Sequence, residues 1–263
     1  MAVTQNGTTT TTTYGYNTEK NRLTSITVNG STQNVTYDTS GNSLSDGTNT
    51  YTWNAANELA SVKIPNGTTY AYTYDGLGRR ATAYGNTYHY NGLSTQLTYI
   101  TNSSNGLVAR FSYDGEGRPA YMTLGSGQVY RYVYDGQGDV IAFIDESTGS
   151  QVVTYGYDAW GNLISSSDTS GANASTVNPF TYRGYVYDSQ TGLYYLNARY
   201  YNPVTGRFLT EGPHSANNGA ALSANEYAYV ESDPINLIDP SGQDAIVLEA
   251  TGGALGLGHI ALQ

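Results

Sequence analysis

The chain has none of the residues needed for thiol chemistry and few of the cations needed to bind nucleic acids. It has no cysteine, and its 11 Lys and Arg residues are outnumbered by 21 Asp and Glu residues, which leaves a formal net charge of −10. The lack of cysteine excludes disulfides and thiol chemistry. Binding to a nucleic acid is favoured when Lys and Arg side chains displace counterions from its phosphates. This chain has few such side chains and a negative net charge, so we expect no nucleic-acid partner. No apolar run approaches the roughly 20 residues of a transmembrane helix, so we expect no membrane span.

The aromatic residues are unevenly chosen. There are 27 Tyr but only 4 Phe, and hydrophobic residues make up 38% of the chain. Tyrosine hydroxyls need hydrogen-bond partners when they are buried. We therefore expect a wide and partly polar core, which is typical of an extended sheet that curls around a lumen rather than of a compact sandwich.

The most informative feature that is present is a repeat. A tyrosine followed by aspartate or asparagine, then two or three residues and a glycine, recurs about every 16 to 23 residues along most of the chain. A period this regular indicates one supersecondary unit that buries its apolar face only by stacking on further copies. The clear copies lie at 37–41, 74–78, 113–117, 134–138 and 157–161, and degenerate copies begin at Tyr16, Trp53, Tyr90 and Tyr187.

Each copy carries the residues of a hairpin turn. The aspartate can accept a hydrogen bond from the backbone amide two residues on, and the glycine allows the positive φ of a tight reversal. Before the turn, side chains alternate, so that 69–74 and 129–134 each place three tyrosines on one face of a strand. The sequence therefore predicts an all-β fold of antiparallel hairpins stacked into one curled sheet, with most tyrosines packed on its surface.

Composition divides the chain into three parts. We predict a tyrosine–aspartate (YD) repeat sheet over 1–178, a denser block without repeats over 179–242, and the beginning of a variable C-terminal region over 243–263. Within the first part, the Ser/Thr/Asn/Gly-rich segment 165–176 favours a mobile loop. The N-terminal residues have neither the basic nor the apolar region of a signal peptide, which we interpret as a start within a longer chain.

The block over 179–242 carries short motifs in a characteristic order. They are Thr191-Gly192-Leu193, then Ala198-Arg199-Tyr200-Tyr201 with Pro203 and Gly206-Arg207-Phe208, and finally Asp239-Pro240-Ser241-Gly242. Together with the repeats, this block resembles the Rhs repeat-associated core, which closes the YD-repeat shells of bacterial Rhs and wall-associated polymorphic toxins, of the C component of Tc toxins and of teneurins. The resemblance implies a β-sheet that spirals into a hollow shell or barrel, with the block as a plug at one end.

The resemblance also implies a function. Shells of this family enclose a C-terminal toxin domain until it is delivered. We therefore expect an encapsulating module of a bacterial protein that is secreted or displayed on the cell surface, with its own C-terminal cargo domain as the main partner. Further copies of the chain, bound through unpaired sheet edges, are a second expected partner.

In Rhs and Tc members, the core resembles an aspartyl protease that cuts its own chain after an Asp-Pro-x-Gly-Leu element. Asp239 matches the aspartate of that element, but Gln243 stands where the family has leucine. The second family aspartate, in Gly-Arg-Phe-x-x-x-Asp-Pro, falls on Gly212. Since aspartyl chemistry needs two carboxyl groups that share a proton, Glu211 and Asp233 are the candidates to act with Asp239. Autoproteolysis is the only enzymatic activity that we expect.

The same block also has a purely structural interpretation. Asp233 and Asp239 each precede a proline, a pair that is typical of turns. Arginines among aromatic residues stack on the rings and bridge carboxylates. The residues that we expect to build the plug in this way are Arg199, Arg207, Tyr200 and Phe208.

No other chemical site can be assembled from the sequence. There is no zinc-type spacing or phosphate loop, so we expect no metal and no cofactor. His259 lies in a strand-like segment, but the chain has no cysteine for which it could act as a general base. Two further functions stay open: a self-assembling surface or fibre protein whose sheet edges pair, and a carbohydrate-binding module whose exposed tyrosines stack on sugar rings.

Overall fold

The computed structural model describes residues 2–5, 8–17, 22–212, 225–243 and 245–247. They form two compact units, one from the described residues of Met1–Tyr72 and Leu209–Tyr227, the other from those of Thr73–Phe208 and the chain from Ala228 on. Both units are built almost entirely from antiparallel strands. The prediction of an all-β fold with a long antiparallel sheet is confirmed, whereas closure of the sheet into a shell stays a prediction.

The first unit contains the N-terminal strands and a returning segment. Strands β1 to β4 form one sheet in sequence order, and β5 to β9 also follow one another in sequence order. The described residues of Leu209–Tyr227 also belong here: the Leu209 carbonyl accepts the Ser43 amide at 2.8 Å, and the Tyr227 hydroxyl donates to the Gly41 carbonyl at 2.7 Å. The strands are β1 (Ala2–Gln5), β2 (Thr8–Tyr16), β3 (Leu23–Val28), β4 (Ser31–Asn34), β5 (Thr36–Tyr37), β6 (Ser43–Ser45), β7 (Thr50–Trp53), β8 (Leu59–Lys63) and the first four residues of β9 (Thr69–Tyr74), whose last two residues belong to the second unit.

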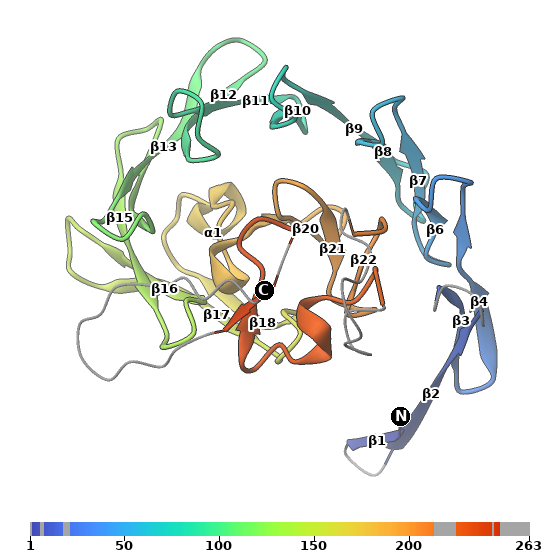
Figure 1. Cartoon of the computed structure of the whole chain (residues 1–263). Helices are drawn as coiled ribbons and strands as arrows, with labels where there is room; N and C mark the ends of the chain where they lie inside the picture. Colours follow the sequence, from blue (N-terminus) through green and yellow to red (C-terminus); the bar gives the residue numbers. More distant parts are fainter. Residues whose placement is uncertain (1, 6–7, 18–21, 213–224, 244, 248–263) are drawn as a thin grey trace. The chain divides into compact units, whose positions relative to one another are not determined.

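The second unit contains the longest run of regular strands, which we call the wall. Each strand from β10 to β18 pairs antiparallel with its neighbours along the chain. Within this unit the strands follow a curve (Figure 1). They are β10 (Arg80–Ala83), β11 (Asn86–Tyr90), β12 (Leu97–Asn102), β13 (Leu107–Tyr113), β14 (Pro119–Leu124), β15 (Val129–Tyr134), β16 (Val140–Asp145), β17 (Gln151–Tyr157) and β18 (Leu163–Asp168).

The other described residues of the second unit lie on the inner side of that curve (Figure 1). The short helix α1 (Ala174–Val177) leads into residues 179–208 and 228–243, which we call the plug. The plug contains a small sheet in the order β19-β20-β21-β22, and β23 pairs with β24. Its elements are η1 (Tyr182–Gly184), β19 (Val186–Asp188), β20 (Leu193–Tyr195), β21 (Tyr200–Asn202), β22 (Arg207–Phe208), η2 (Val230–Ser232) and β23 (Leu237–Ile238), and β24 is Ile246–Val247.

The turns of the repeats have the predicted chemistry. Asp135 Oδ1 accepts hydrogen bonds from the amides of Gln137 and Asp139, both at 2.9 Å. Gly138 has a φ of 87°, in the left-handed region that favours glycine. The hydrogen bond from the second amide, four residues after the aspartate, was not part of the sequence prediction. It joins both ends of the turn to the same carboxylate oxygen. The same two amide bonds recur at Asp38, Asp75, Asp114 and Asp158.

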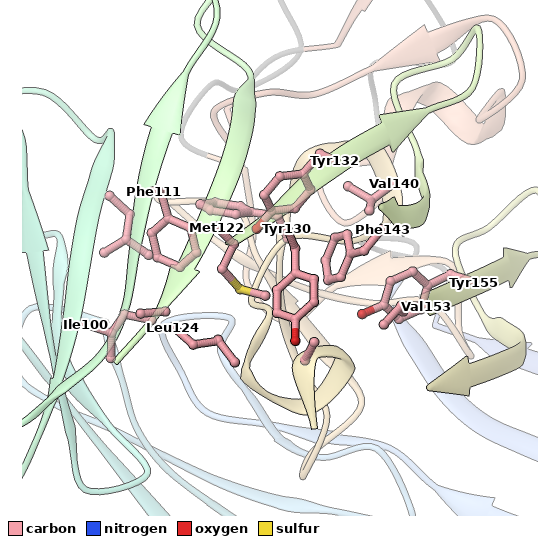
Figure 2. Packing of buried hydrophobic residues seen from close by; sticks show 14 residues of the cluster. Ile100, Phe111, Met122, Leu124, Tyr130, Tyr132, Val140, Phe143, Val153 and Tyr155 are labelled. Carbon is pink, nitrogen blue, oxygen red and sulfur yellow. The ribbon is translucent and has the colours of Figure 1, made fainter. Parts of the chain in front are cut away.

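One face of the wall is buried against the plug. Strand alternation places one apolar residue after another on this face (Figure 2). Phe180 of the plug packs among them, with its ring 5.1 Å from that of Phe111 and nearly perpendicular to it. The residues labelled in Figure 2 are Ile100, Phe111, Met122, Leu124, Tyr130, Tyr132, Val140, Phe143, Val153 and Tyr155.

The tyrosine that begins a repeat makes a hydrogen bond to the backbone of the preceding repeat. The Tyr134 hydroxyl donates to the Pro119 carbonyl at 2.6 Å, and the Tyr157 hydroxyl donates to the Val140 carbonyl at 2.9 Å. A phenylalanine would fill the same space but would lose these two hydrogen bonds. The excess of tyrosine over phenylalanine thus reflects a core whose aromatic residues also make hydrogen bonds.

The predicted loop over 165–176 is wrong in part. Strand β18 extends to Asp168, and the register places Ser166 opposite Tyr155 of β17. Asp168 Oδ2 also accepts the amide of Ser175 at 2.8 Å, just after the start of α1. Serine has little strand preference of its own, and pairing with β17 overrides that preference.

Candidate functional site

The Asp239 carboxyl group organises the turn that follows β23. Its Oδ1 atom accepts amide hydrogen bonds from Gly242 at 2.8 Å, from Gln243 at 3.1 Å and from Ser241 at 3.3 Å. Asp239 is only 1% exposed. Gly242 has a φ of 74°, and a Cβ atom there would lie 2.6 Å from the Leu196 carbonyl oxygen. The turn is therefore tight, buried and dependent on both Asp239 and Gly242.

Arg199 holds the same turn from the other side. Its Nη2 atom lies 3.4 Å from Asp239 Oδ2 and donates to the Gln243 carbonyl at 3.3 Å. Its Nε atom donates to the Gly242 carbonyl, and its guanidinium lies over the Phe208 ring, 3.5 Å from the ring centre. The guanidinium thus contacts the carboxylate and two consecutive carbonyl groups of the element Asp239–Gln243.

Two tyrosines complete the surroundings of Asp239. The Asp239 amide donates to the Tyr185 hydroxyl at 3.0 Å, and this hydroxyl lies 3.0 Å from that of Tyr229. Burial raises the pKa of Asp239, while the Arg199 charge and the amides of the turn act in the opposite direction. Burial also raises the pKa of both tyrosines, which keeps their hydroxyls protonated.

The other carboxyl candidates are engaged elsewhere. Asp233 is half-buried, and its Oδ2 atom accepts the side-chain amide of Asn236 at 2.9 Å. Glu211 belongs to the first unit, where its Oε1 atom pairs with the Arg22 guanidinium and accepts the Tyr227 hydroxyl at 3.3 Å. Within the described residues of its own unit, the hydrogen bonds and the ion pair of Asp239 include no second carboxyl group.

The other plug residues named from the sequence lie in the small sheet of the plug. The Tyr200 hydroxyl accepts that of Tyr74 at 3.0 Å, and its ring lies 5.1 Å from that of Tyr195. Arg207 is paired through its backbone with Ala228 in an isolated bridge, and with β21. His259 lies outside the described residues.

A buried ion pair joining wall and plug was missed by the sequence reasoning. Arg80 Nη1 of β10 lies 2.6 Å from Asp188 Oδ2 of β19, and their side chains are 0% and 2% exposed. The Arg80 guanidinium lies between the rings of Tyr88 and Tyr195, 4.8 Å from each centre. The Arg80 amide also donates to the Tyr195 hydroxyl at 3.0 Å. The only sequence signal was that Asp188 belongs to the degenerate copy that begins at Tyr187.

A second link between wall and plug centres on Arg183. Its amide donates to Asp139 Oδ1 at 2.8 Å, and its side chain donates to the carbonyls of Gln137 at 2.9 Å and of Pro234 at 2.5 Å. Gln137 in turn donates from its side chain to the Ile235 carbonyl at 3.1 Å. Burial raises the pKa of Asp139 to about 6, opposed by the Arg183 amide and charge. Two plug segments are thereby tied to one wall turn.

The described part of the chain offers neither a metal centre nor a membrane helix. No group of His, Cys, Asp and Glu side chains there is arranged to hold a metal ion. No helix among the described residues is both long and apolar enough to span a membrane. The Asp239 turn and the two wall–plug links are the buried polar features of the second unit that bear on its function.

Comparison with known proteins supports a shared architecture. A family model described as "Teneurin YD-shell" matches residues 2–235. The tRNA nuclease WapA of Bacillus subtilis (strain 168) is 36% identical over 151 residues, which are 57% of this chain and 6% of WapA. Double-stranded DNA deaminase toxin A of Burkholderia cenocepacia (strain H111) is 34% identical over 83 residues, which are 32% of this chain and 5% of that protein. This chain therefore spans only a small part of the length of these relatives.

Solved structures share the fold. A Photorhabdus luminescens Tc holotoxin pore matches with a TM-score of 0.62 and 21% identity, over 93% of this chain and 14% of that one. A crystal structure of TcdB2-TccC3-TEV matches with a TM-score of 0.61 and 21% identity, over 89% of this chain and 13% of that one. At this level of identity the likeness concerns the fold and not the activity.

Proposed function

The chain belongs to the teneurin YD-shell family, and from this premise we propose that it forms wall and plug of a shell that encloses the C-terminal toxin domain of a secreted or surface-displayed bacterial protein. The observation that carries the proposal is the buried attachment of the plug to the inner side of the wall. The Arg80–Asp188 ion pair and the hydrogen bonds of Arg183 span the two parts. Removing one member of a buried ion pair leaves the other buried without its partner, so the attachment of the plug depends on both Arg80 and Asp188.

The relatives support a role as the carrier of a toxin domain rather than as a catalyst. One is named as a tRNA nuclease and another as a double-stranded DNA deaminase, which are two unrelated chemistries. The segments that match this chain are 6% and 5% of those proteins. A segment shared by proteins of different activity fits a common carrier, with the activity carried by another part of each chain.

Limited proteolysis of the full-length gene product tests the enclosure. The sequence C-terminal to Gln243 is expected to survive protease in the folded protein and to be digested once urea unfolds the shell. An Asp188→Asn variant, which weakens the link to β19, is expected to shorten that survival. If the C-terminal sequence were digested equally fast with and without urea, the enclosure proposal would be wrong.

A second candidate function is self-cleavage after Gln243. The specific observation in its favour is the Arg199 Nη2 hydrogen bond to the Gln243 carbonyl, the group on which negative charge would develop during attack. Burial also raises the pKa of Asp239, which is the direction that aspartyl chemistry requires of one of its two carboxyl groups. The engagement of Asp233 and Glu211 with other partners favours the structural role of Asp239 instead.

Intact mass spectrometry decides between these two roles of Asp239. Cleavage after Gln243 predicts two products from the expressed chain, and Asp239→Asn should restore a single one. A structural role predicts one mass for both proteins, together with lower stability of Asp239→Asn. One mass for the unaltered chain excludes the cleavage candidate and leaves the enclosure proposal intact.

A further inference from the structure

The outer face of the wall carries aromatic and cationic side chains on consecutive strands, which we call the outer row. It consists of His89 on β11, Tyr99 on β12, Arg110 on β13, Tyr121 on β14 and Arg131 on β15. Successive side chains of a strand point to opposite faces of the sheet. The last four members each directly precede a residue of the buried face, so they point away from the core. Those buried residues are Ile100, Phe111, Met122 and Tyr132 (Figure 2).

The register divides the outer row into two equivalent pairs. Tyr99 stands directly opposite Arg110, and Tyr121 stands directly opposite Arg131. Each pair thus has a tyrosine on one strand and an arginine on the next. Arg110 is also opposite Thr123, two residues from Tyr121. The pairs are therefore displaced by about 10 Å across the sheet and about 7 Å along the strands.

The side chains of both pairs are accessible. Tyr99 and Tyr121 are 40% and 37% exposed. Arg110 is exposed, and its side chain makes no hydrogen bond or ion pair with any residue that the structure describes. Arg131 Nε donates to Glu146 Oε1 at 2.9 Å, with both side chains exposed. This last contact demonstrates that a guanidinium of the outer row can hold a carboxylate at the surface.

The orientation of Tyr99 leaves one ring face open. His89 covers the other face, with ring centres 4.1 Å apart and planes 9° from parallel. Because β12 lies between β11 and β13, the open face is turned towards the strand that carries Arg110. A flat group placed there would contact the tyrosine ring and the guanidinium together.

We propose that the outer row binds an acidic polysaccharide with a carboxylate on every second sugar. Each pair holds one acidic sugar, whose ring stacks on the tyrosine while its carboxylate accepts hydrogen bonds from the arginine. The displacement of the two pairs is one that two linked sugars span. A net charge of −10 opposes general attraction of polyanions, so binding depends on these paired contacts. The aromatic rings favour a glycan over a polymer that offers charge alone.

Calorimetric titration of the purified chain tests this proposal. The probe is a hexasaccharide of alternating glucuronate and N-acetylglucosamine, and the comparison ligand is a neutral N-acetylglucosamine hexasaccharide. Only the acidic probe is expected to bind. Tyr99→Ala and Arg110→Ala are each expected to weaken binding about threefold to tenfold. Glu146→Gln is expected to strengthen binding, because it releases Arg131 from its competing carboxylate.

A matched variant separates the outer row from overall charge. Arg118 is 49% exposed in the turn between β13 and β14, so Arg118→Ala removes the same charge outside the outer row and is expected to leave the affinity unchanged. An equal loss in Arg118→Ala and Arg110→Ala would overturn the proposal. Equal binding of the neutral hexasaccharide, equally tight binding of a single-stranded oligonucleotide, or no binding of the acidic probe would do so as well. Failure here leaves the enclosure proposal untouched, because the outer row lies on the opposite face from the plug.

Discussion

Replacing Arg80 by methionine isolates the energetic contribution of the link between wall and plug. Methionine retains much of the side-chain volume between Tyr88 and Tyr195 but removes the charge. Asp188, 2% exposed, is then left without the guanidinium 2.6 Å away. Leaving one member of a buried ion pair unpaired typically costs about 3 to 5 kcal/mol. We expect the free energy of unfolding of the second unit to fall by about that amount.

A double replacement distinguishes charge from packing. In Arg80→Met with Asp188→Leu, both charges are gone and no uncompensated carboxylate remains. Apolar replacement of a whole buried pair is often neutral or stabilising. We therefore expect the double variant to unfold within about 1 kcal/mol of the original protein, and hence a strong coupling between the two positions.

The assay must report on the second unit alone. Trp160 lies in this unit against the plug core, and Trp53 lies in the other, so the measurement uses urea unfolding followed by Trp160 fluorescence in a Trp53→Phe background. Arg118→Met provides a control, because its pair with Asp114 is exposed and should change stability by less than about 1 kcal/mol. A loss below about 1 kcal/mol in Arg80→Met, or a double variant that loses as much as the sum of the single variants, would show that the Arg80–Asp188 ion pair does not act as described.

Three further predictions concern single contacts. Burial raises the pKa of Asp139 from 3.8 to about 6, so the folded state binds this proton more tightly than the unfolded state. The free energy of unfolding should then fall by at most about 3 kcal/mol as pH rises through that interval, and urea titrations at several pH values should lack this slope in Asp139→Asn. Tyr134→Phe removes a hydroxyl bonded to a backbone carbonyl and should lower the free energy of thermal unfolding by about 1 kcal/mol. Tyr121→Phe, at the surface, should lower it by almost nothing. Equal losses would contradict the role given to the Tyr134 hydroxyl. Gly242→Ala should destabilise the protein by about 1 to 3 kcal/mol because of the positive φ of Gly242 and the nearby Leu196 carbonyl. Gly136→Ala, with open space around it, should be nearly neutral. A Gly242→Ala variant as stable as the original protein would show that the turn is not constrained.

The turns were predictable from sequence because their chemistry is local. The Asp135 side chain binds amides two and four residues on, and Gly138 supplies the reversal within the same five residues. The side-chain alternation in 129–134 likewise needs only the geometry of one strand. These features recur in each copy, so the all-β antiparallel architecture followed from the repeat.

Strand β18 shows where local reasoning was insufficient. Residues 165–168 have the composition of a loop, yet they pair with β17 across the whole strand. Pairing with an existing edge supplies backbone hydrogen bonds that composition does not reveal. The Asp239 turn is an intermediate case, because its Asp-Pro pair was visible, whereas the Arg199 contact joins residues 40 positions apart.

The neighbouring residues Arg79 and Arg80 show the difference between a contact that is encoded locally and one that depends on the whole fold. Arg79 pairs with Asp75 at 2.7 Å inside its own repeat turn, at a spacing of four residues that the turn geometry dictates. Arg80 pairs with Asp188, 108 residues away, and is completely buried. The first contact depends on the backbone of one turn, so it can be read from the repeat. The second depends on the curvature of the wall and the path of the plug, which arise from many packing contacts together, and no single stretch of sequence encodes it.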